Sequence, residues 1–563
     1  MTRRPPEPDD GEPDDIGRDA ASALPGEPEG VAESEPPRSP AAPPPAGAHS
    51  SIHRASALLA SGTLVSRILG FIRAIVLAAI IGQVGSTAGN AWALSTQLPN
   101  NIYALVAGGL LGAVLVPQIV RAAQHDDGGE RYINKIVTLG TTAFLVIAVL
   151  GTLGAPLLVT LYAQSDETRG FTGEGLALAT AFAYWCLPQV MFYAVYSLLG
   201  QVLNARGRFG AFTWAPVVNN IVALAGLGVF AVLFGGASEN STVQTWDAAR
   251  IALLGGSATA GVAAQALILA VFWRSAGLSF RPDFRWRGVG LARTGRAAGW
   301  TFGMILVTQF AGVFQSRVAS LAADDAGAAT LQNSWLLFML PHSVIAVSIA
   351  TAYFTRMSRH ASHGDVDAMR DDVSASLRGI GVLITFASAA LIVVAFPFAR
   401  VFERDFDNVT AMALVIIAFV IGLVPFSSVF VLQRAFFSLE DTRTPFVVEA
   451  IKAALFIIGA LCCALLPTVW IGVGIALVTT LACAVQTVIT FALLRRKVGP
   501  LGGWLLLRRF GQYLFAAALA AGVGIGLLGA VGGARADGFA QSGVPASMIS
   551  MALIGLGMGL VYL

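Results

Sequence analysis

The sequence predicts an all-α polytopic membrane protein: about fourteen transmembrane helices, forming two pseudo-symmetric six-helix lobes around a central cationic cavity, plus two extra helices. Three observations lead to this prediction. The 563 residues are 55% hydrophobic and 12% charged, with a mean hydropathy of +0.70, which is too apolar for a soluble globular protein. Long apolar runs recur from residue 57 onward, and segments of the first half resemble segments of the second.

Residues 1–50 form a segment rich in Pro, Asp, Glu and Ala with almost no large apolar side chains. Such a segment cannot bury enough surface to offset its chain entropy, so we predict a disordered cytoplasmic tail. It lacks the basic start and apolar core of a signal peptide. The first spanning helix therefore acts as its own insertion signal.

The predicted spans are apolar runs of about 20 residues between charged or Gly/Pro-rich breaks. They cover residues 57–81, 89–119, 136–162, 176–200, 213–235, 249–273, 297–322, 329–355, 377–399, 409–432, 445–466, 469–494, 510–531 and 545–563. An even number of spans places both ends of this chain on one side of the membrane. Because the chain stops inside its last span without a basic flank, we expect a cytoplasmic segment to follow in the full protein.

Basic residues concentrate in the loops on the side of the N-terminus, for example between residues 274 and 296 and between 495 and 509. The opposite loops carry few basic residues and most of the loop acids. By the positive-inside rule, the N-terminus is cytoplasmic.

Two pairs of segments indicate an internal repeat. "LPNNIYALV" at Leu98 matches "LPHSVIAVS" at Leu340 in its opening Leu-Pro, and polar loops ending in proline follow residues 201 and 433. We predict an N-lobe at 57–273, a C-lobe at 297–494 and two additional helices at 510–563. Lobes of equal topology imply a symmetry axis along the membrane normal and a cleft between them.

The first span carries Arg67 and Arg73 without an acidic residue. A central arginine costs about 2.5 to 3.5 kcal/mol on insertion scales. Snorkelling offsets this cost tolerably for Arg73 and poorly for Arg67. The alternative is that both face a wet cleft and bind an anion such as phosphate. Being six residues apart, they would flank a ligand about 120° apart around the helix.

Three further charged residues lie deep in predicted spans. Arg317 either joins the cationic cleft or neutralises Asp324 or Asp325, about two turns onward. Glu449 has Lys452 one turn later on the same face, which indicates mutual neutralisation or, alternatively, a coupling or gating element.

The stretch "LEDTRTP" supplies a helix start, with Asp441 or Thr444 as cap and Pro445 in the first turn. Asp441 and Arg443 are also candidates for a hinge or coupling role. The four cysteines lie in apolar runs with no metal-site spacing. No nucleotide-binding or catalytic motif is present. We therefore expect no enzyme activity, no metal or cofactor and no nucleic-acid partner.

The segments "SGTLVSRILGFIRAIVLAAIIG", "LPNNIYALVAGGLLGAVLVPQIVRA", "FTWAPVVNNIV" and "LQRAFFSLEDTRTPF" resemble the MurJ (MviN) family of lipid II flippases, in the multidrug/oligosaccharidyl-lipid/polysaccharide exporter superfamily. The resemblance covers residue 57 to the end. It implies a multi-pass protein of the bacterial plasma (inner) membrane, substrate-binding roles for Arg67 and Arg73, and a groove for the polyprenyl tail at 510–563.

This sequence departs from the family pattern at several positions. Asn90 stands where the family has an aspartate, which keeps it as a candidate substrate-binding residue. Ala74 replaces an acidic residue, and Leu336 replaces a cavity arginine in the eighth span. One interpretation is that Arg317 compensates for the arginine missing at Leu336. The family's sodium site has no counterpart that we can assign, so the coupling ion stays open.

We expect a flippase that carries lipid-linked peptidoglycan precursor (lipid II) to the outer leaflet by alternating access. Its partners would be lipid II, membrane lipids and, through the cytoplasmic tails, proteins of cell-wall synthesis and division. The alternatives are a flippase for another polyprenyl-diphosphate saccharide, a drug or cation exporter, and a non-transporting cell-wall scaffold. A cation exporter needs an acidic cleft, and a scaffold has no use for unpaired membrane arginines.

Overall fold

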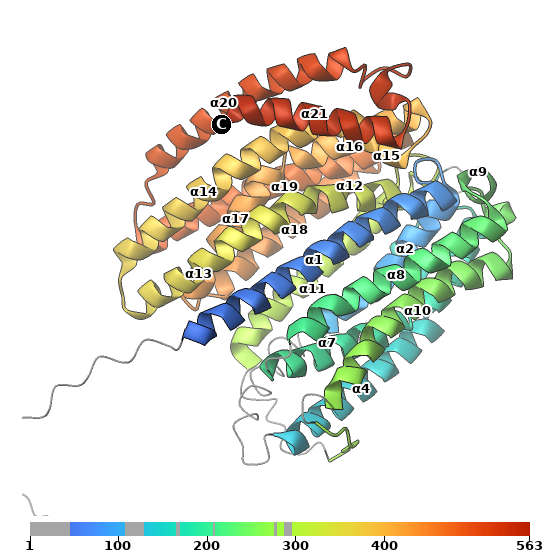
Figure 1. Ribbon diagram of the computed structural model, residues 1–563, viewed down its shortest axis with the longest axis horizontal. Coiled ribbons are helices and arrows are strands. Elements are labelled where there is room, and N and C mark those ends of the chain that lie inside the picture. Colours follow the sequence, from blue (N-terminus) through green and yellow to red (C-terminus); the bar gives the residue numbers. More distant parts are fainter. Residues whose placement is uncertain (1–45, 107–128, 165–168, 207–208, 275–277, 286–294) are drawn as a thin grey trace, which may run out of the picture. The chain divides into compact units, whose positions relative to one another are not determined.

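A computed structural model describes residues 46–106, 129–164, 169–206, 209–274, 278–285 and 295–563 (Figure 1). Residues 54–563 form one compact unit, and residues 1–53 are assigned to a separate one. The predicted disordered tail lies outside the described residues up to residue 45. The second predicted span, 89–119, is described as far as Val106.

The helices of the first half keep the predicted name N-lobe. They are α1 (Ala46–Ile81), α2 (Thr87–Val106), α4 (Glu130–Leu153), α5 (Ala155–Tyr162), α6 (Gly173–Cys186), α7 (Gln189–Ala205), α8 (Phe209–Phe234), the short α9 (Ala237–Asn240) and α10 (Ala248–Trp273). Local chemistry sets several of these boundaries. The Thr172 hydroxyl accepts from the Gly175 amide at 3.1 Å, and the Asp247 carboxylate accepts from the Arg250 amide at 2.8 Å. Both are N-caps, the first of α6 and the second of α10.

The second half keeps the name C-lobe up to α19. Its helices are α11 (Gly295–Ser320), α12 (Ala328–Pro341), the π-helical turn η4 (His342–Ala346), α13 (Val347–Ser362), α14 (Val366–Val393), α15 (Ala395–Phe402), α16 (Phe406–Val420), α17 (Leu423–Ser438), α18 (Arg443–Cys463) and α19 (Thr468–Val498). Two helices follow, α20 (Gly503–Ala530) and α21 (Val544–Tyr562), which pack on each other. α20 also packs along α14.

Twelve helical segments of the described chain are long and apolar enough to cross a membrane. The all-α polytopic class is therefore confirmed, while the predicted number of about fourteen is not. The two predicted spans outside this set correspond to α2 and α11. α2 is described only as far as Val106, and both helices carry amide side chains, which lower their hydropathy. Five of these amides line a cavity described below: Gln97, Asn100, Asn101, Gln309 and Gln315.

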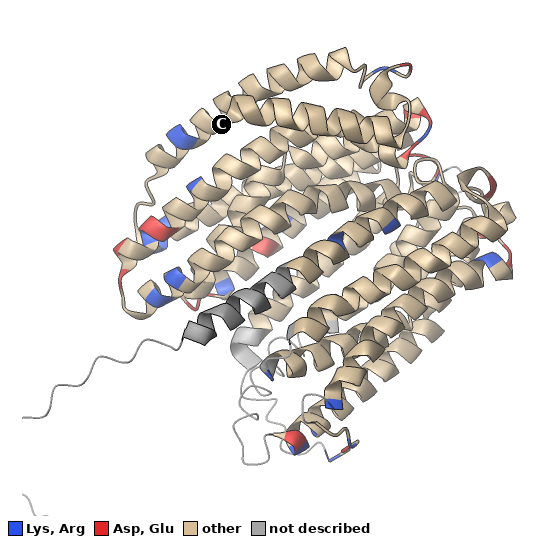
Figure 2. Cartoon of the chain, in the orientation of Figure 1, with Lys and Arg blue, Asp and Glu red and all other residues tan. Residues whose placement is uncertain are grey.

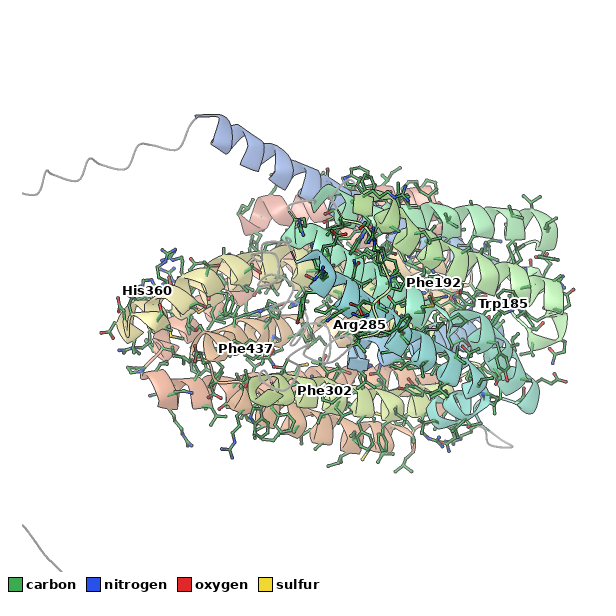
Figure 3. The ribbon with its side chains drawn as sticks, turned by 90° about the horizontal axis from the view of Figure 1, so that it is seen from below. Trp185, Phe192, Arg285, Phe302, His360 and Phe437 are labelled. Carbon is green, nitrogen blue, oxygen red and sulfur yellow. The ribbon has the colours of Figure 1, made fainter. Side chains whose placement is uncertain are left out.

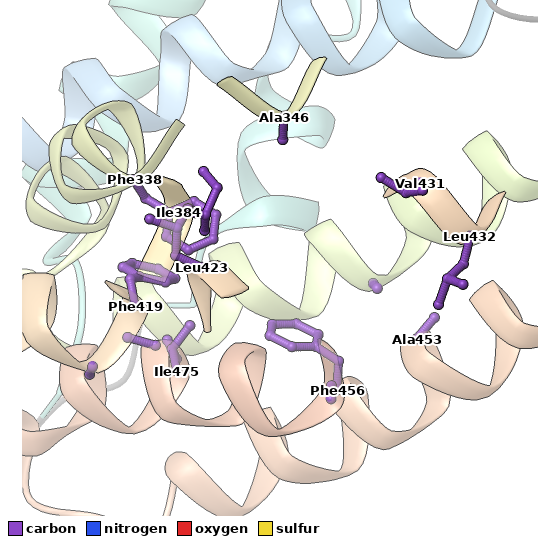
Figure 4. Packing of buried hydrophobic residues seen from close by; sticks show 14 of the residues in the cluster. Phe338, Ala346, Ile384, Phe419, Leu423, Val431, Leu432, Ala453, Phe456 and Ile475 are labelled. Carbon is purple, nitrogen blue, oxygen red and sulfur yellow. The ribbon is translucent and has the colours of Figure 1, made fainter. Parts of the chain in front are cut away.

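Each lobe is stabilised internally by its own apolar cores. One core draws its buried side chains from α11 to α20, including Phe338, Phe419 and Phe456 (Figure 4). Two other cores lie in the N-lobe, around Phe182 and Phe230 in one case and around Phe144 in the other.

α1 runs between the two lobes (Figure 1). On its N-lobe side, Gly62 approaches the Thr213 and Trp214 side chains of α8 closely. On its C-lobe side, Arg67 contacts Ser343 of η4. α1 is thus in contact with both lobes, and both of its membrane arginines lie at this boundary.

The two ends of the helices differ in charge. We call the end that holds the α13–α14, α17–α18 and α19–α20 turns the basic end, because lysines and arginines gather mainly there (Figure 2). His360 lies at this end, on α13 (Figure 3). We call the opposite end, with the α1–α2, α11–α12 and α15–α16 turns, the seam end.

Candidate functional site

Arg67 connects the lobes. Its Nη1 atom donates a hydrogen bond to the Ser343 hydroxyl, which in turn donates to the Leu340 carbonyl at 3.0 Å. Ser343 lies in the π-helical turn η4, directly after Pro341. Proline and the wide turn both interrupt regular α-helical hydrogen bonding. Arg67 is therefore bound at the point where the eighth predicted span changes its helical form.

Arg73 lies six residues further along α1 and faces the N-lobe. It is partly exposed and interacts electrostatically with Tyr193 of α7 and Cys186 of α6. It makes no hydrogen bond or ion pair to any residue that the structure describes. The different directions of Arg67 and Arg73 fit their predicted angular separation. The Arg73 guanidinium therefore has N–H donors that no described residue accepts.

Arg317 is tied to the end of another helix. Its Nη1 atom donates to the carbonyls of Thr160 at 3.0 Å and Leu161 at 3.2 Å, in the last turn of α5. These carbonyls are the acceptors that a helix C-terminus leaves without partners. The expectation that Asp324 or Asp325 neutralises Arg317 is wrong for the described chain, and Asp324 accepts from the Thr87 hydroxyl at 3.1 Å.

Asn90 is fully engaged in a contact between the lobes. Its side chain is 1% exposed; its amide nitrogen donates to the Ala323 carbonyl at 2.7 Å, and its oxygen accepts from the Ala329 amide at 2.9 Å. Asn90 therefore fastens α2 to the α11–α12 turn at the seam end. It is not among the residues that line the cavity between the lobes.

Glu449 and Lys452 form the predicted ion pair within α18. Glu449 is 6% exposed, and its carboxylate accepts two further hydrogen bonds, from Gln486 Nε2 at 2.7 Å and from Thr308 Oγ1 at 3.1 Å. The group thus links α11, α18 and α19. Gln486 and Thr308 were not singled out from the sequence, because nothing in their local spacing relates them to Glu449.

Asp441 and Arg443 lie at the basic end. The Asp441 carboxylate accepts from the Thr444 amide at 3.0 Å, from the Thr444 hydroxyl at 2.8 Å and from Lys497 Nζ at 2.6 Å. Burial acts to raise the pKa of Asp441, but the bonds from Lys497 and Thr444 outweigh it and hold the pKa below its ordinary value. Asp441 is therefore the cap at the start of α18. The Arg443 guanidinium lies over the Trp300 ring, 6.0 Å from its centroid.

A cavity of about 480 Å³ lies between the lobes. Its polar lining is dominated by amides and hydroxyls, with the Glu449–Lys452 pair at one side; these residues are Gln97, Asn100, Asn101, Thr308, Gln309, Gln315, Ser316, Gln332 and Thr479. Two hydrogen bonds cross it, from Ser316 Oγ to Gln97 Oε1 at 3.0 Å and from Gln309 Nε2 to the Asn101 carbonyl at 2.9 Å. The sequence analysis did not single out this site, and the group of amides inside α2 and α11 is the signal that could have found it.

A second cavity, of about 760 Å³, is mostly apolar. Its walls come from α14, α17, α19 and α20 and include Leu432, Phe491, Leu506 and Phe510, with Arg495 and Arg496 also in the lining. The predicted tail-binding groove involved the last two helices. Of these two, α20 lines the cavity and α21 does not.

At the seam end, backbone and side chains join the two lobes. The α1–α2 turn lies between the α11–α12 and α15–α16 turns: the Gly85 amide donates to the Asp325 carbonyl at 3.1 Å, and the Val84 amide donates to Glu403 Oε1 at 2.8 Å. With the Asn90 contacts, these bonds close the space between the lobes at this end.

Comparison with known proteins gives one consistent result. A family model described as "Lipid II flippase MurJ" matches residues 77–538. The probable lipid II flippase MurJ of Rhizobium tropici is 27% identical over 472 residues, covering 82% of this chain and 84% of that protein. The probable lipid II flippase MurJ of Haemophilus influenzae (strain ATCC 51907 / DSM 11121 / KW20 / Rd) is 25% identical over 413 residues, covering 68% and 75%.

Two solved structures show the same fold. A lipid II flippase MurJ in an inward closed conformation superposes with a TM-score of 0.68 at 18% identity, covering 90% of this chain and 97% of that one. An inward-facing multidrug resistance transporter of the MATE family, in the MOP superfamily, has a TM-score of 0.61 at 17% identity, covering 78% and 96%.

Proposed function

Because the chain belongs to the MurJ family of lipid II flippases, we propose that it moves lipid II from the inner to the outer leaflet of the bacterial plasma membrane. The observation that carries this proposal in the molecule itself is Arg73, a partly exposed guanidinium without a hydrogen-bond or ion-pair partner among the described residues. A guanidinium pairs with phosphate oxygens through two parallel N–H donors. Arg73 would hold the diphosphate, and Arg67 would join it on leaving Ser343.

The remaining parts of a lipid-linked saccharide match the two cavities. The amide-lined cavity between the lobes offers donors and acceptors to the uncharged sugar and peptide groups. The apolar cavity beside α20 suits part of a polyprenyl tail, which gains by remaining out of water. Glu449 and Lys452 border the first cavity as an internally neutral pair, so we assign them a supporting role in its shape.

We infer that the basic end is cytoplasmic and that the lobes alternate in access. The positive-inside rule supports the orientation. The seam end is closed by single hydrogen bonds, each of which contributes little free energy. Such bonds can break one by one, and therefore suit a gate that opens toward the outside. A membrane potential negative inside favours outward movement of an anion by about 2.3 kcal/mol per charge per 100 mV.

Cysteine labelling in whole cells tests the orientation. Gly173, the first residue of α6, and Ser238, in the short α9, are exposed near the seam end, and Ser362, the last residue of α13, is exposed at the basic end. Cysteines at Gly173 and Ser238 should react with a membrane-impermeant reagent from outside, whereas one at Ser362 should react only after permeabilisation. The reverse pattern would invert the orientation and the direction of transport.

A flipping assay in proteoliposomes tests the function. Wild-type protein should translocate lipid II, and Arg73→Ala should reduce the rate at least tenfold, with Arg73→Lys intermediate because an ammonium lacks the fork geometry. Arg317→Ala serves as the matched control, since Arg317 is committed to helix carbonyls. Transport of a different polyprenyl-diphosphate saccharide in preference to lipid II would reassign the substrate, and no transport at all would favour the scaffold. Contacts of the tails with cell-wall proteins stay a prediction.

A further inference from the structure

The seam contains one carboxyl group that bridges the lobes. Glu403, in the α15–α16 turn, accepts a hydrogen bond from the Val84 amide of the α1–α2 turn at 2.8 Å. Asn408, at the start of α16, donates to the Val84 carbonyl at 3.4 Å and also hydrogen-bonds to the Glu403 carboxyl. Both peptide groups of Val84 are therefore held by the C-lobe, and Glu403 supplies the shorter contact.

Glu403 is buried without a cation to balance it. It is 7% exposed and forms no ion pair with any residue in the described part of the chain. Arg400 is close in sequence, but its guanidinium donates to main-chain carbonyls instead, with Nε 2.6 Å from the Gln541 oxygen and Nη1 2.9 Å from the Glu403 oxygen. Arg400 thus supports the backbone of this turn and leaves the carboxyl uncompensated.

The other charged groups around the carboxyl can be named. It lies in a hollow of about 720 Å³, whose described lining contains Arg400, Arg404 and Asp405 as the remaining charged residues, all from the C-lobe. The α1–α2 turn, α9 and the start of α21 add no charged lining residue there. Glu239 of α9 interacts electrostatically with Arg404.

A buried carboxylate without a counter-charge favours its neutral form. Burial accordingly raises the pKa of Glu403 to about 7, because it outweighs the bonds from Val84 and Asn408, which lower that pKa; the charge of Asp405 adds a small further increase. Glu403 therefore changes its charge near neutral pH while it is enclosed in the seam.

We propose that Glu403 is a proton-binding site that controls the seam: with the proton bound the seam stays closed, and loss of the proton favours separation of the lobes at this end. The proposal rests on the proposed function only for the assumption that the seam end faces outward. It assigns the proton a site in the gate and makes no use of the substrate cavity.

The direction of the effect follows from linkage. When the seam opens, the carboxyl meets water and its pKa returns toward the ordinary value of 4.5. The closed state binds the proton more tightly, so protonation stabilises closure, and that stabilisation is lost as pH rises through about 7. With these two pKa values, the open-to-closed ratio should increase about 70-fold between about pH 5 and about pH 8.

An acidic outer surface would therefore help the gate to close once a substrate has left. The proton enters from, and returns to, the side on which the seam opens, because Glu403 lies at the seam end. Glu403 would accordingly set the occupancy of the outward-open state rather than supply the driving force for transport.

Hydrogen exchange tests the proposal on the full-length protein in lipid nanodiscs without lipid II. The measurement is the protection of the Val84 and Gly85 amides, corrected for the intrinsic pH dependence of exchange, because it detects rare openings. Wild-type protection should fall about 70-fold between about pH 5 and about pH 8. Glu403→Gln, which is neutral at every pH and nearly the same size, should keep high protection throughout.

Two further variants separate this site from its neighbours. Asp405→Asn keeps the N-cap of α16 and should retain the transition, with a midpoint no higher than that of wild type. Asn408→Ala removes a bond that favours the charged carboxyl, so its midpoint should move upward. The α18–α19 turn, residues 464–467, carries no charged residue and should show no transition.

Two results would overturn the proposal: wild-type protection that does not change with pH, or an unchanged transition in Glu403→Gln. Asn408→Ala keeps the question decidable if Glu403→Gln folds poorly. Because no substrate is present, failure here leaves the flipping result untouched, and failure of Arg73→Ala to impair flipping leaves this result untouched.

Discussion

Arg317 provides a sharp test of how the membrane arginines divide their roles. The structure ties it to the Thr160 and Leu161 carbonyls, so we expect Arg317→Ala to reduce stability and to leave flipping per folded molecule close to wild type. The competing interpretation is that Arg317 replaces the family arginine absent at Leu336. On that interpretation, Arg317→Ala abolishes flipping, and adding Leu336→Arg restores part of it.

The size of the stability loss follows from the two bonds. Hydrogen bonds to charged groups contribute about 1.5 to 3 kcal/mol each when buried, and a cation at a helix C-terminus adds about 0.3 to 1 kcal/mol. Arg317 is partly exposed, so water would replace some of this in the variant. We expect Arg317→Ala to lower the free energy of unfolding by about 1 to 3 kcal/mol.

Reversible unfolding in mixed micelles, paired with flipping normalised to folded protein, measures both quantities. Arg169→Ala is the matched control, because Arg169 is exposed and its contacts to the Ala464 and Leu466 carbonyls are long, at 3.5 Å each. Its effect should stay within about 0.5 kcal/mol. Unchanged stability with complete loss of flipping in Arg317→Ala, and recovery on adding Leu336→Arg, would refute the reasoning.

Three other outcomes are expected. Lys452→Met leaves the Glu449 carboxylate buried without its cation and should cost about 3 to 5 kcal/mol of unfolding free energy, most of which returns in the double variant with Glu449→Gln. Because the pKa of Asp441 is depressed in the folded state, its stabilising contribution should be complete at neutral pH and disappear as pH falls below about 4; Asp441→Asn should flatten that part of an unfolding curve measured against pH. Asn90→Ala leaves the Ala329 amide without its acceptor and should speed hydrogen exchange of that amide about tenfold or more, equivalent to about 1 to 3 kcal/mol.

The sequence predicted the features that depend on residues lying close together in the chain. The i, i+3 relation of Glu449 and Lys452 predicted an ion pair that is present, and "LEDTRTP" predicted a cap that Asp441 provides. The apolar runs predicted the helices. Within the first of them, Arg67 and Arg73 were recognised as cations without an acidic neighbour. In each case, the interacting groups are close in sequence or the signal is an average over one helix.

Contacts between distant segments escaped the sequence. The partner of Arg317 is a carbonyl 157 residues away in the chain, and nothing near Thr160 signals a need for a cation. Glu403, in "RVFERDF", has the composition of an ordinary surface turn. Its burial exists only because the α1–α2 turn of the other lobe covers it, which is a property of the assembled lobes.

The π-helical turn at His342–Ala346 has a consequence for how this protein tolerates insertion and deletion. A π-turn accommodates one residue more than a regular α-helical turn, so deleting one residue there would leave a continuous helix. Every side chain of α13 would then rotate by about 100° relative to α12. Arg356, now 2.7 Å from Asp372 of α14, would face away from its partner. Length changes in the eighth span should therefore be rare among functional homologues. Where they occur, substitutions on the surface of α13 should accompany them.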